Sequence, residues 1–359
     1  MLFKKYVSLI PVIIFFYLQL EGQVKSKYDL LTESYVARPL CMHKGQIQLN
    51  SGYEFSIINA KYDQEHEKVD LTMDGSVSAK HLIPVELKFG LLEHVQLSAS
   101  TAYASLGIRS QCHNILSGES MLNVFEVNTY QGLKDLYLGT DLTAPFKGHL
   151  INWVISAGIS LPVFNHEPDK PDHSYTIIDY VTGSARLEYR YNWKYATGVP
   201  KGFLGSSIKL RTGKISITGV FTYITGMKSG ESCDWNFRLV DNEFEYEREK
   251  YQFYPGQTFE YRGEVAVQTI SWLTLWNAFS GYTSNRGWSS ITGKKTGAPE
   301  ESMTSLSLGF EILASPVLRF DQQIVLPVTG KNVIGQLVFQ TGFSLNFIPS
   351  VFHKLNAGL

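Results

Sequence analysis

The residues best suited to metal chemistry lie in one short stretch, residues 165–173. Carboxylate and imidazole side chains are the ligands that proteins offer to calcium and zinc. Five of them occur there: His166, Glu167, Asp169, Asp172 and His173. Two prolines in the same stretch favour a plain solvated turn over a metal site. The run Glu65-His66-Glu67 is interpreted in the same way, so we expect no bound metal and no cofactor.

A serine activated by a histidine would be the second kind of chemistry. His113 lies near Ser110 and Ser117 in the sequence. Nothing in the spacing of these three residues singles them out as a catalytic set. A surface enzyme is therefore the weakest of the interpretations considered, and we expect no enzymatic activity.

Three cysteines occur in the chain, at positions 41, 112 and 233. An odd number leaves at least one thiol free or paired between chains. In the topology argued below, Cys112 and Cys233 lie on one side of a membrane and Cys41 lies on the other. Export permits disulfides, so Cys112 and Cys233 are expected to pair if any two cysteines do.

Charged residues recur on the polar faces of segments that alternate between apolar and polar side chains. Twelve of them are candidates for the lining of a lumen: Glu54, Glu86, Lys88, Asp141, Lys209, Arg211, Glu260, Arg262, Glu264, Glu311, Arg319 and Asp321. They could form a selectivity path, or a salt-bridged network that fills and steadies the interior. Both signs are present, so strong ion selectivity is not expected and the structural network is favoured.

The alternation that places these charges is clearest in Val333–Phe347, near the end of the chain. One set of side chains is largely aromatic and aliphatic, and the intervening set is small and polar. Successive side chains of a strand point to opposite faces. Strands in soluble sandwiches usually have about five or six residues. A strand of this length with one apolar face is typical of a barrel in lipid, apolar outside and polar inside.

The same pattern predicts an all-β protein, a transmembrane antiparallel up-and-down barrel of 12 strands. The eleven strands before Val333–Phe347 are expected at 45–57, 79–89, 95–103, 134–144, 151–161, 203–211, 215–224, 258–269, 272–282, 304–313 and 317–326. The strand at 272–282 alternates poorly. The stretch 180–195 is also strand-like, either as an outer-loop hairpin or in place of the strand at 203–211.

Connector lengths give independent support. Short links alternate with long polar links, apart from one short link at 328–332 between the last two strands. Short periplasmic turns and long outer loops are the build of outer-membrane barrels. The long links are expected at 59–78, 104–133, 162–202, 225–257 and 283–303.

Composition agrees with this fold. Hydrophobic residues make up 44% of the 359 residues, and aromatic residues 13%. The mean hydropathy of -0.08 is too polar for a bundle of membrane helices. The 20 Tyr and 21 Phe suit the aromatic girdles of membrane barrels. A net charge of -1 gives no indication of a nucleic-acid partner.

The chain divides into four expected parts. Residues 1–22 have two lysines followed by an apolar run, which is the pattern of a secretory signal peptide. Residues 23–43 form a lead that lies either in the periplasm or in the lumen. Residues 44–348 form the barrel, and residues 349–359 form a C-terminal tail. We expect the bacterial outer membrane as the location, with its lipid and the barrel-assembly machinery as partners.

Arg38-Pro39, followed by a strand that opens at Gly45, resembles a bacterial outer-membrane barrel family. The motif G-x-S-L-P from Gly158 to Pro162, echoed at 325–327, is also similar. The family is named for the meta-pathway of phenol degradation, and its members are also called outer-membrane transporters. The resemblance implies a barrel that passes small apolar or aromatic compounds, and no functional residues carry over from it. Barrels of this kind often end on an aromatic residue, whereas here a tail follows Phe347.

The sequence therefore favours a membrane channel for small apolar or aromatic molecules. The alternative is a non-conducting barrel whose long outer loops bind a partner or a ligand. Conductance of the purified protein distinguishes these two functions.

Overall fold

The computed structural model describes residue 31 and residues 33–70, 78–117, 120–144, 150–162, 172–179, 184–194, 198–240, 243–291, 294–297 and 300–348. The expected signal peptide at 1–22, the first part of the lead and the expected tail at 349–359 lie outside these residues. Within them, no helix is long and apolar enough to cross a membrane.

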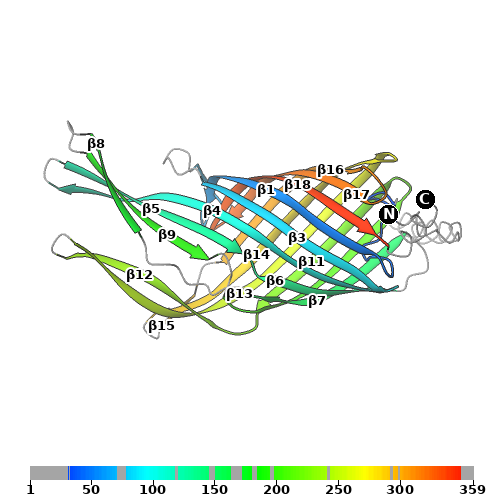
Figure 1. The fold of residues 1–359 in the computed structure, drawn as a ribbon, viewed down its shortest axis with the longest axis horizontal. Coiled ribbons are helices and arrows are strands. Elements are labelled where there is room, and N and C mark those ends of the chain that lie inside the picture. Colours follow the sequence, from blue (N-terminus) through cyan, green and yellow to red (C-terminus); the bar gives the residue numbers. More distant parts are fainter. Residues whose placement is uncertain are drawn as a thin grey trace, which may run out of the picture.

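Twelve strands close into one antiparallel barrel (Figure 1). Each strand pairs with the next along the ring, and the last strand pairs back to the first, from Ile47 opposite Phe347 onward. The strands are β1 (Ile47–Tyr62), β3 (Ser78–Leu92), β4 (Val95–Ser117), β6 (Leu136–Thr143), β7 (Ile151–Leu161), β10 (Lys201–Thr212), β11 (Ile215–Gly226), β13 (Glu243–Ile270), β14 (Leu273–Ile291), β16 (Glu300–Leu313), β17 (Leu318–Lys331) and β18 (Val333–Phe347). Each of the twelve predicted strands, including the poorly alternating one at 272–282, corresponds to one of them, which confirms the predicted fold.

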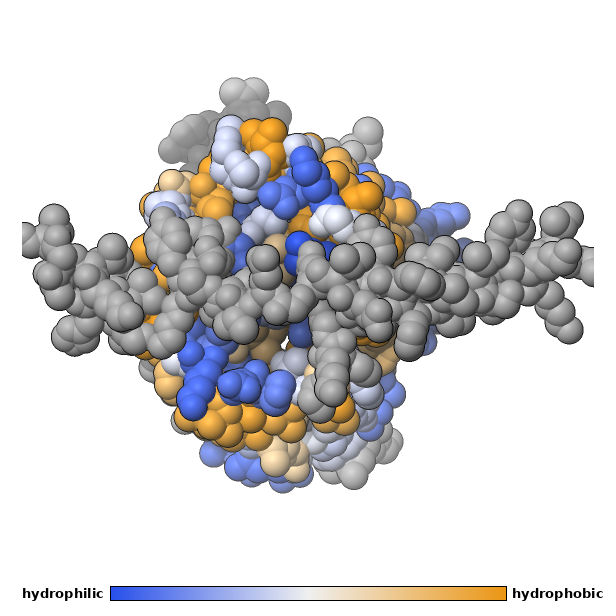
Figure 2. Space-filling model, turned by 90° about the vertical axis from the view of Figure 1, so that its right-hand side faces the viewer, coloured by the Kyte–Doolittle hydropathy of each residue, from blue (hydrophilic) through white to orange (hydrophobic). Residues whose placement is uncertain are grey.

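Apolar side chains gather on the outer surface of the barrel (Figure 2). Val265 in β13 is 40% exposed and lies opposite Ile217 of β11, which is also exposed. Glu264, its neighbour in the chain, is buried at 5% exposure. A wall with an apolar outside and a polar inside is what a spanning barrel requires, because lipid offers no partner to a charged side chain. The barrel is therefore a transmembrane one.

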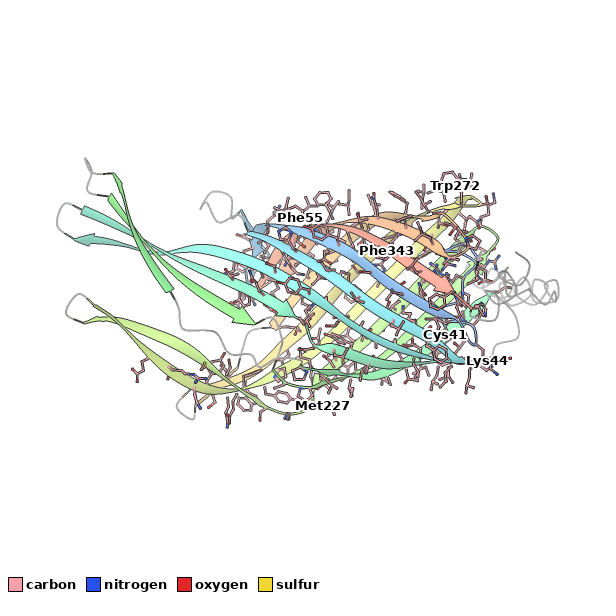
Figure 3. All side chains as sticks on the ribbon, viewed as in Figure 1. Cys41, Lys44, Phe55, Met227, Trp272 and Phe343 are labelled. Atoms are coloured by element: carbon pink, nitrogen blue, oxygen red, sulfur yellow. The ribbon has the colours of Figure 1, made fainter. Side chains whose placement is uncertain are left out.

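The two ends of the barrel differ. Trp272 lies at the end that carries the short turns, and Met227 lies towards the other end (Figure 3). At that other end the structure adds six strands: β2 (Lys68–Asp70), β5 (Ser120–Leu133), β8 (Asp172–Asp179), β9 (Ser184–Lys194), β12 (Gly230–Val240) and β15 (Lys294–Gly297). Several of them extend well beyond the barrel (Figure 1).

Much of the chain expected as long polar loops is thus strand. The β4–β5 hairpin continues from Tyr103 opposite Leu133 to Ser117 opposite Ser120. Ladder hydrogen bonds join backbone groups and do not depend on an apolar face, so polar strands can continue past the membrane. The strand-like stretch 180–195 contains β9, which forms a hairpin with β8 and a parallel pair with β5. It does not displace β10.

Two glycines lie side by side on neighbouring strands of the barrel wall. Gly139 of β6 lies directly opposite Gly158 of β7. The ring of Phe203, from the next strand β10, covers both from inside. A Cβ on Gly158 would meet the Leu138 carbonyl oxygen at 2.2 Å and the Phe203 ring at 2.4 Å. Glycine at position 158 is therefore required by the close approach of backbone and ring.

Candidate functional site

The lead enters the lumen from the end that carries the short turns. Val36 is buried in a cluster with Ala266, Trp276 and Ala278 of the barrel wall, and Tyr35 packs against this cluster. Ala266 and Trp276 face each other across β13 and β14. Burial of these apolar side chains stabilises the seat of the lead. The described part of the lead therefore lies against the inner side of the barrel wall.

Two side chains of the lead bond to carboxylates of the wall. The Tyr35 hydroxyl donates to Glu264 Oε1 at 2.5 Å. The Arg38 Nη2 atom donates to Glu311 Oε2 at 2.7 Å. Hydrogen bonds to charged groups contribute about 1.5–3 kcal/mol each, so these two contacts fix the middle of the lead against β13 and β16.

Cations of the wall bond in turn to carbonyl oxygens of the lead. Lys209 Nζ donates to the carbonyl of Tyr35 at 2.6 Å and to that of Arg38 at 3.0 Å. Arg319, only 1% exposed, donates through Nη2 to the carbonyl of Leu31 at 3.0 Å. Backbone groups that do not pair with a strand are thereby satisfied inside the barrel.

Amide side chains of the wall hold the following part of the lead. Asn152 Oδ1 accepts from the Leu40 N–H at 2.9 Å, and Gln96 Oε1 accepts from the Met42 N–H at 2.8 Å. Beyond Met42, Gly45 and Gln46 exchange backbone hydrogen bonds with Gly90 of β3 and lead into β1.

Burial changes the acidity of two groups in the lead. Burial, and then the negative charge of Glu264, raise the pKa of Tyr35, so the phenol stays protonated as the donor to that carboxylate. Burial raises the pKa of the Cys41 thiol to about 11, with a smaller opposing effect from a hydrogen bond to Thr143. Both groups are therefore neutral at physiological pH.

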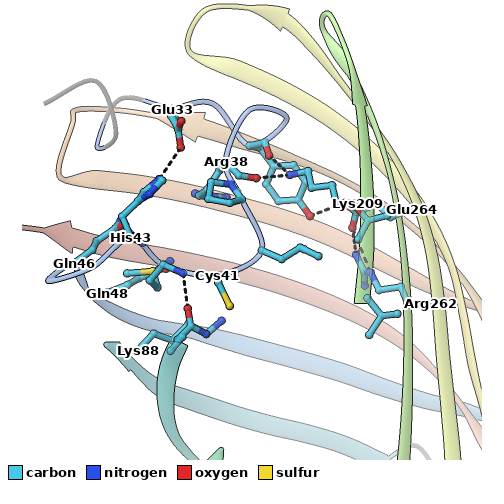
Figure 4. Close-up of a pocket in the computed structure, with 17 residues that line it drawn as sticks. Glu33, Arg38, Cys41, His43, Gln46, Gln48, Lys88, Lys209, Arg262 and Glu264 are labelled. Carbon is cyan, nitrogen blue, oxygen red and sulfur yellow. Dashed lines mark hydrogen bonds and ion pairs between the residues drawn. The ribbon is translucent and has the colours of Figure 1, made fainter. Parts of the chain in front are cut away.

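Three larger cavities lie beside the lead or beyond it, and a fourth, of about 80 Å³, also contacts the lead. The outer cavity, of about 970 Å³, is lined by β11, β13, β14, β16 and β18, with Glu260 and Arg262 among its residues. The β10-side cavity, of about 260 Å³, lies between the lead and an arc of wall that includes Lys88, Lys209 and Glu264 (Figure 4). The β17-side cavity, of about 340 Å³, lies between the lead and the opposite arc.

The structure places the twelve predicted lumen residues in and beside these cavities. Lys88, Lys209, Arg262 and Glu264 line the β10-side cavity, and Arg211 lines a smaller one beside it. Glu86, Glu311 and Asp321 line the β17-side cavity, and Glu260 lines the outer cavity. The remaining three make polar contacts: Glu54 pairs with Lys80 at 3.2 Å, Asp141 accepts from Gln96 at 2.5 Å, and Arg319 bonds to the lead.

Many of these charges are paired, as a structural network requires. Arg262 contacts Glu264 at 2.7 Å, and Lys88 contacts Glu86 at 3.1 Å. Sequence reasoning did not include Tyr35, Arg38 and Trp276 in the site. An aromatic residue and an arginine in a short lead next to a charged lumen were the available signal. The carboxylate partners of Tyr35 and Arg38 lie more than 200 residues away, and no local pattern encodes such a contact.

The other chemical candidates are not assembled into a site. His166, Glu167 and Asp169 lie outside the described residues, as do the side chains of Asp172 and His173 in β8. In the described part of the chain no three potential metal ligands gather. The run 65–67 forms a turn in which Asp63 Oδ1 accepts from the N–H groups of Glu65 and Glu67.

Ser110, His113 and Ser117 lie in the outer part of β4, and their side chains are outside the description. Cys41 and Cys233 are free, buried thiols in this structure. The side chain of Cys112 also lies outside the described part. The pairing of Cys112 with Cys233 stays a prediction, which mass mapping under non-reducing conditions checks.

Comparison with known proteins gives a likeness of fold. No protein-family model matches the chain, and no curated protein matches its sequence. An outer-membrane channel from Pseudomonas putida F1 is similar in structure, with a TM-score of 0.57 and 11% identity, over 90% of this chain and 100% of that one. A monoaromatic hydrocarbon channel, a TodX deletion mutant, has a TM-score of 0.46 and 8% identity, over 86% of this chain and 91% of that one. The chain therefore has the fold of an outer-membrane β-barrel.

Proposed function

We propose that this protein is an outer-membrane channel that passes small apolar or aromatic compounds. The observation that carries the proposal is the series of cavities along the barrel. The outer cavity and the two cavities beside the lead share Arg262 as a lining residue. The outer cavity and both inner cavities therefore adjoin one another at this side chain.

The lining of the outer cavity suits a solute with an apolar body and a polar group. Val220, Met303 and Val325 supply apolar surface, and hydroxyl and charged side chains lie among them. Binding sites for small molecules commonly combine apolar walls with a few polar groups. The structurally similar protein from Pseudomonas putida F1 is an outer-membrane channel, which agrees with this function.

Planar-bilayer recording with the purified full-length protein tests the proposal. We expect stepwise single-channel currents, and a current that falls as phenol is added while the same concentration of glycerol leaves it unchanged. Phenol enters the outer cavity and displaces ions there, whereas glycerol has no apolar body to bury. A protein that inserts as a folded barrel and carries no current would contradict the proposal.

A non-conducting binding protein is the alternative. The strands beyond the barrel favour it, because β5, β8, β9 and β12 offer a large surface outside the membrane (Figure 1). The lead also fills part of the lumen. Absence of current together with normal folding would support this second function.

A further inference from the structure

The lead divides the lumen instead of simply narrowing it. Four side chains line both inner cavities: Tyr35 and Arg38 of the lead, Gln48 of β1 and Arg262 of β13. β13 is the eighth of the twelve barrel strands counted from β1, so it stands nearly opposite β1 in the ring. The two cavities therefore adjoin along Tyr35 and Arg38 of the lead, between wall residues that stand nearly opposite each other in the ring.

The two cavities differ in charge. The lining of the β17-side cavity holds three carboxylates, Glu86, Glu311 and Asp321, together with the two shared arginines, and Glu311 is paired with Arg38. The β10-side cavity has the same two arginines with Lys88 and Lys209, against two carboxylates, Glu33 and Glu264, so its lining is the more positive. An excess of one charge sign in a narrow space raises the local concentration of the opposite ion. The β17-side cavity is therefore the more favourable of the two for a cation.

Arg262 stands where the three cavities meet. It lines the outer cavity and both inner ones, which no other described residue does. Its Nη2 and Nε atoms donate to Glu264 Oε2 at 2.7 and 3.3 Å, and its guanidinium lies 5.1 Å from the centre of the Trp276 ring. Glu264 faces the β10-side cavity and Trp276 faces the β17-side cavity. The positive charge is thus held at the mouth of both.

We propose that Arg262 is the specificity-determining residue of the lumen, and that it favours small organic anions, such as aromatic carboxylates, over organic cations. In the proposed channel, a solute that moves from the outer cavity into either inner cavity passes this guanidinium. A planar guanidinium binds carboxylates and stacks on aromatic rings, whereas a solute ammonium is repelled before it reaches the acidic β17-side cavity. The inference rests on the proposed channel function and names its solute class. The mixed charges of the whole lumen still limit the size of the preference.

Reversal potentials in planar bilayers test this role. Gradients of potassium benzoate and of benzylammonium chloride give the permeability of two aromatic ions that differ in charge sign. We expect Arg262→Gln to lower the benzoate-to-benzylammonium ratio about fivefold, the effect of one charge a few ångströms from the path. Arg262→Lys keeps the charge and should keep the ratio within about twofold.

The Glu264→Gln variant distinguishes an effect of charge on permeability from an effect of a lead that has lost its contacts with the wall. Removal of this carboxylate strengthens the field of Arg262, so the ratio should rise, whereas Arg262→Gln makes it fall. If both substitutions instead released the lead from the wall, the benzoate-to-benzylammonium ratio would change in the same direction in both variants, and both conductances would rise. That result would overturn the inference. Lys214→Gln, in the exposed turn between β10 and β11, controls for net charge and should leave the ratio unchanged.

An unchanged ratio in a conducting Arg262→Gln protein would overturn this inference and leave the channel function intact. A wild-type barrel that folds and carries no current would overturn the channel function, and this inference with it. The two failures are therefore distinguishable in one series of recordings.

Discussion

Individual residues of the lead show how a polar segment is kept inside a membrane barrel. Tyr35 and Arg38 each meet a carboxylate of the wall, and Lys209 bonds to the carbonyls of these same two residues. Each buried polar group that finds a partner avoids a desolvation cost of about 1–3 kcal/mol. The site therefore consists of contacts between the lead and the wall, and several residues together hold the lead in place.

The pKa of Cys41 depends on the burial of the lead inside the barrel. Its pKa of about 11 in the folded protein lies above the ordinary 9.0. The stabilisation from the neutral thiol is fully present below pH 9.0 and is lost as the pH rises through about 11. In a Cys112→Ser/Cys233→Ser protein, we expect iodoacetamide to label Cys41 about a hundredfold more slowly at pH 8 than in the unfolded chain, because only the thiolate reacts.

The rate should rise about tenfold per pH unit up to about pH 11. Mass spectrometry of the quenched reaction measures it. The same protein unfolded in denaturant is the control. Equal rates in the folded and unfolded forms would mean that the lead is not seated in the lumen.

At the scale of the strand, alternation decides which substitutions the membrane tolerates. Val265 points to lipid, and Glu264 points to the lead. We expect Val265→Arg to cost about 2–4 kcal/mol of folding free energy, because it places a charge in the apolar band. Folding yield into liposomes, read by the mobility of unheated protein in gels, measures the effect.

Two variants of the same strand are the controls. Ile270→Arg lies on the outer surface but at the end of β13, where the cost of a charge falls to about 0–1 kcal/mol. Glu264→Gln keeps the volume and should change ion selectivity much more than folding yield. Equal yields for Val265→Arg and Glu264→Gln would show that the register is wrong by one residue.

Packing between strands gives a second prediction at this scale. Gly158→Ala should reduce folding yield and heat resistance, because its Cβ would overlap the Leu138 carbonyl and the Phe203 ring. Gly263→Ala is the matched control in β13, where a Cβ meets nothing within 4 Å. Thermal unfolding in detergent compares them. Similar midpoints for the two variants would contradict the close contact at the glycine pair.

The whole molecule is a closed sheet in which β18 pairs with β1. A barrel without free edges has no unpaired ladder from which unfolding can begin, and it keeps all backbone groups bonded in lipid. We expect the unheated protein in detergent to run in gels at an apparent mass different from that of the boiled protein. Identical mobility, or recovery in the soluble periplasmic fraction, would contradict the barrel.

The twelve barrel strands and their two faces could be predicted from the sequence. Alternation is a local property with a period of two residues, and lipid outside with polar side chains inside imposes it on every spanning strand. Val265 and Glu264 could therefore be assigned to opposite faces without a structure. The short turns followed from the same pattern, because each strand must end where the apolar band ends.

The position of the lead and the pairing of the charges could not be predicted from the sequence, because they depend on contacts between distant residues. The partners of Tyr35 and Arg38 are 229 and 273 residues away in the chain, and closure of the ring is what brings them within reach. The lead has no regular alternation of apolar and polar residues. Its position therefore depends on the shape and charge of a lumen that exists only once β18 has paired with β1. The division of that lumen, with Arg262 at the junction, has the same origin.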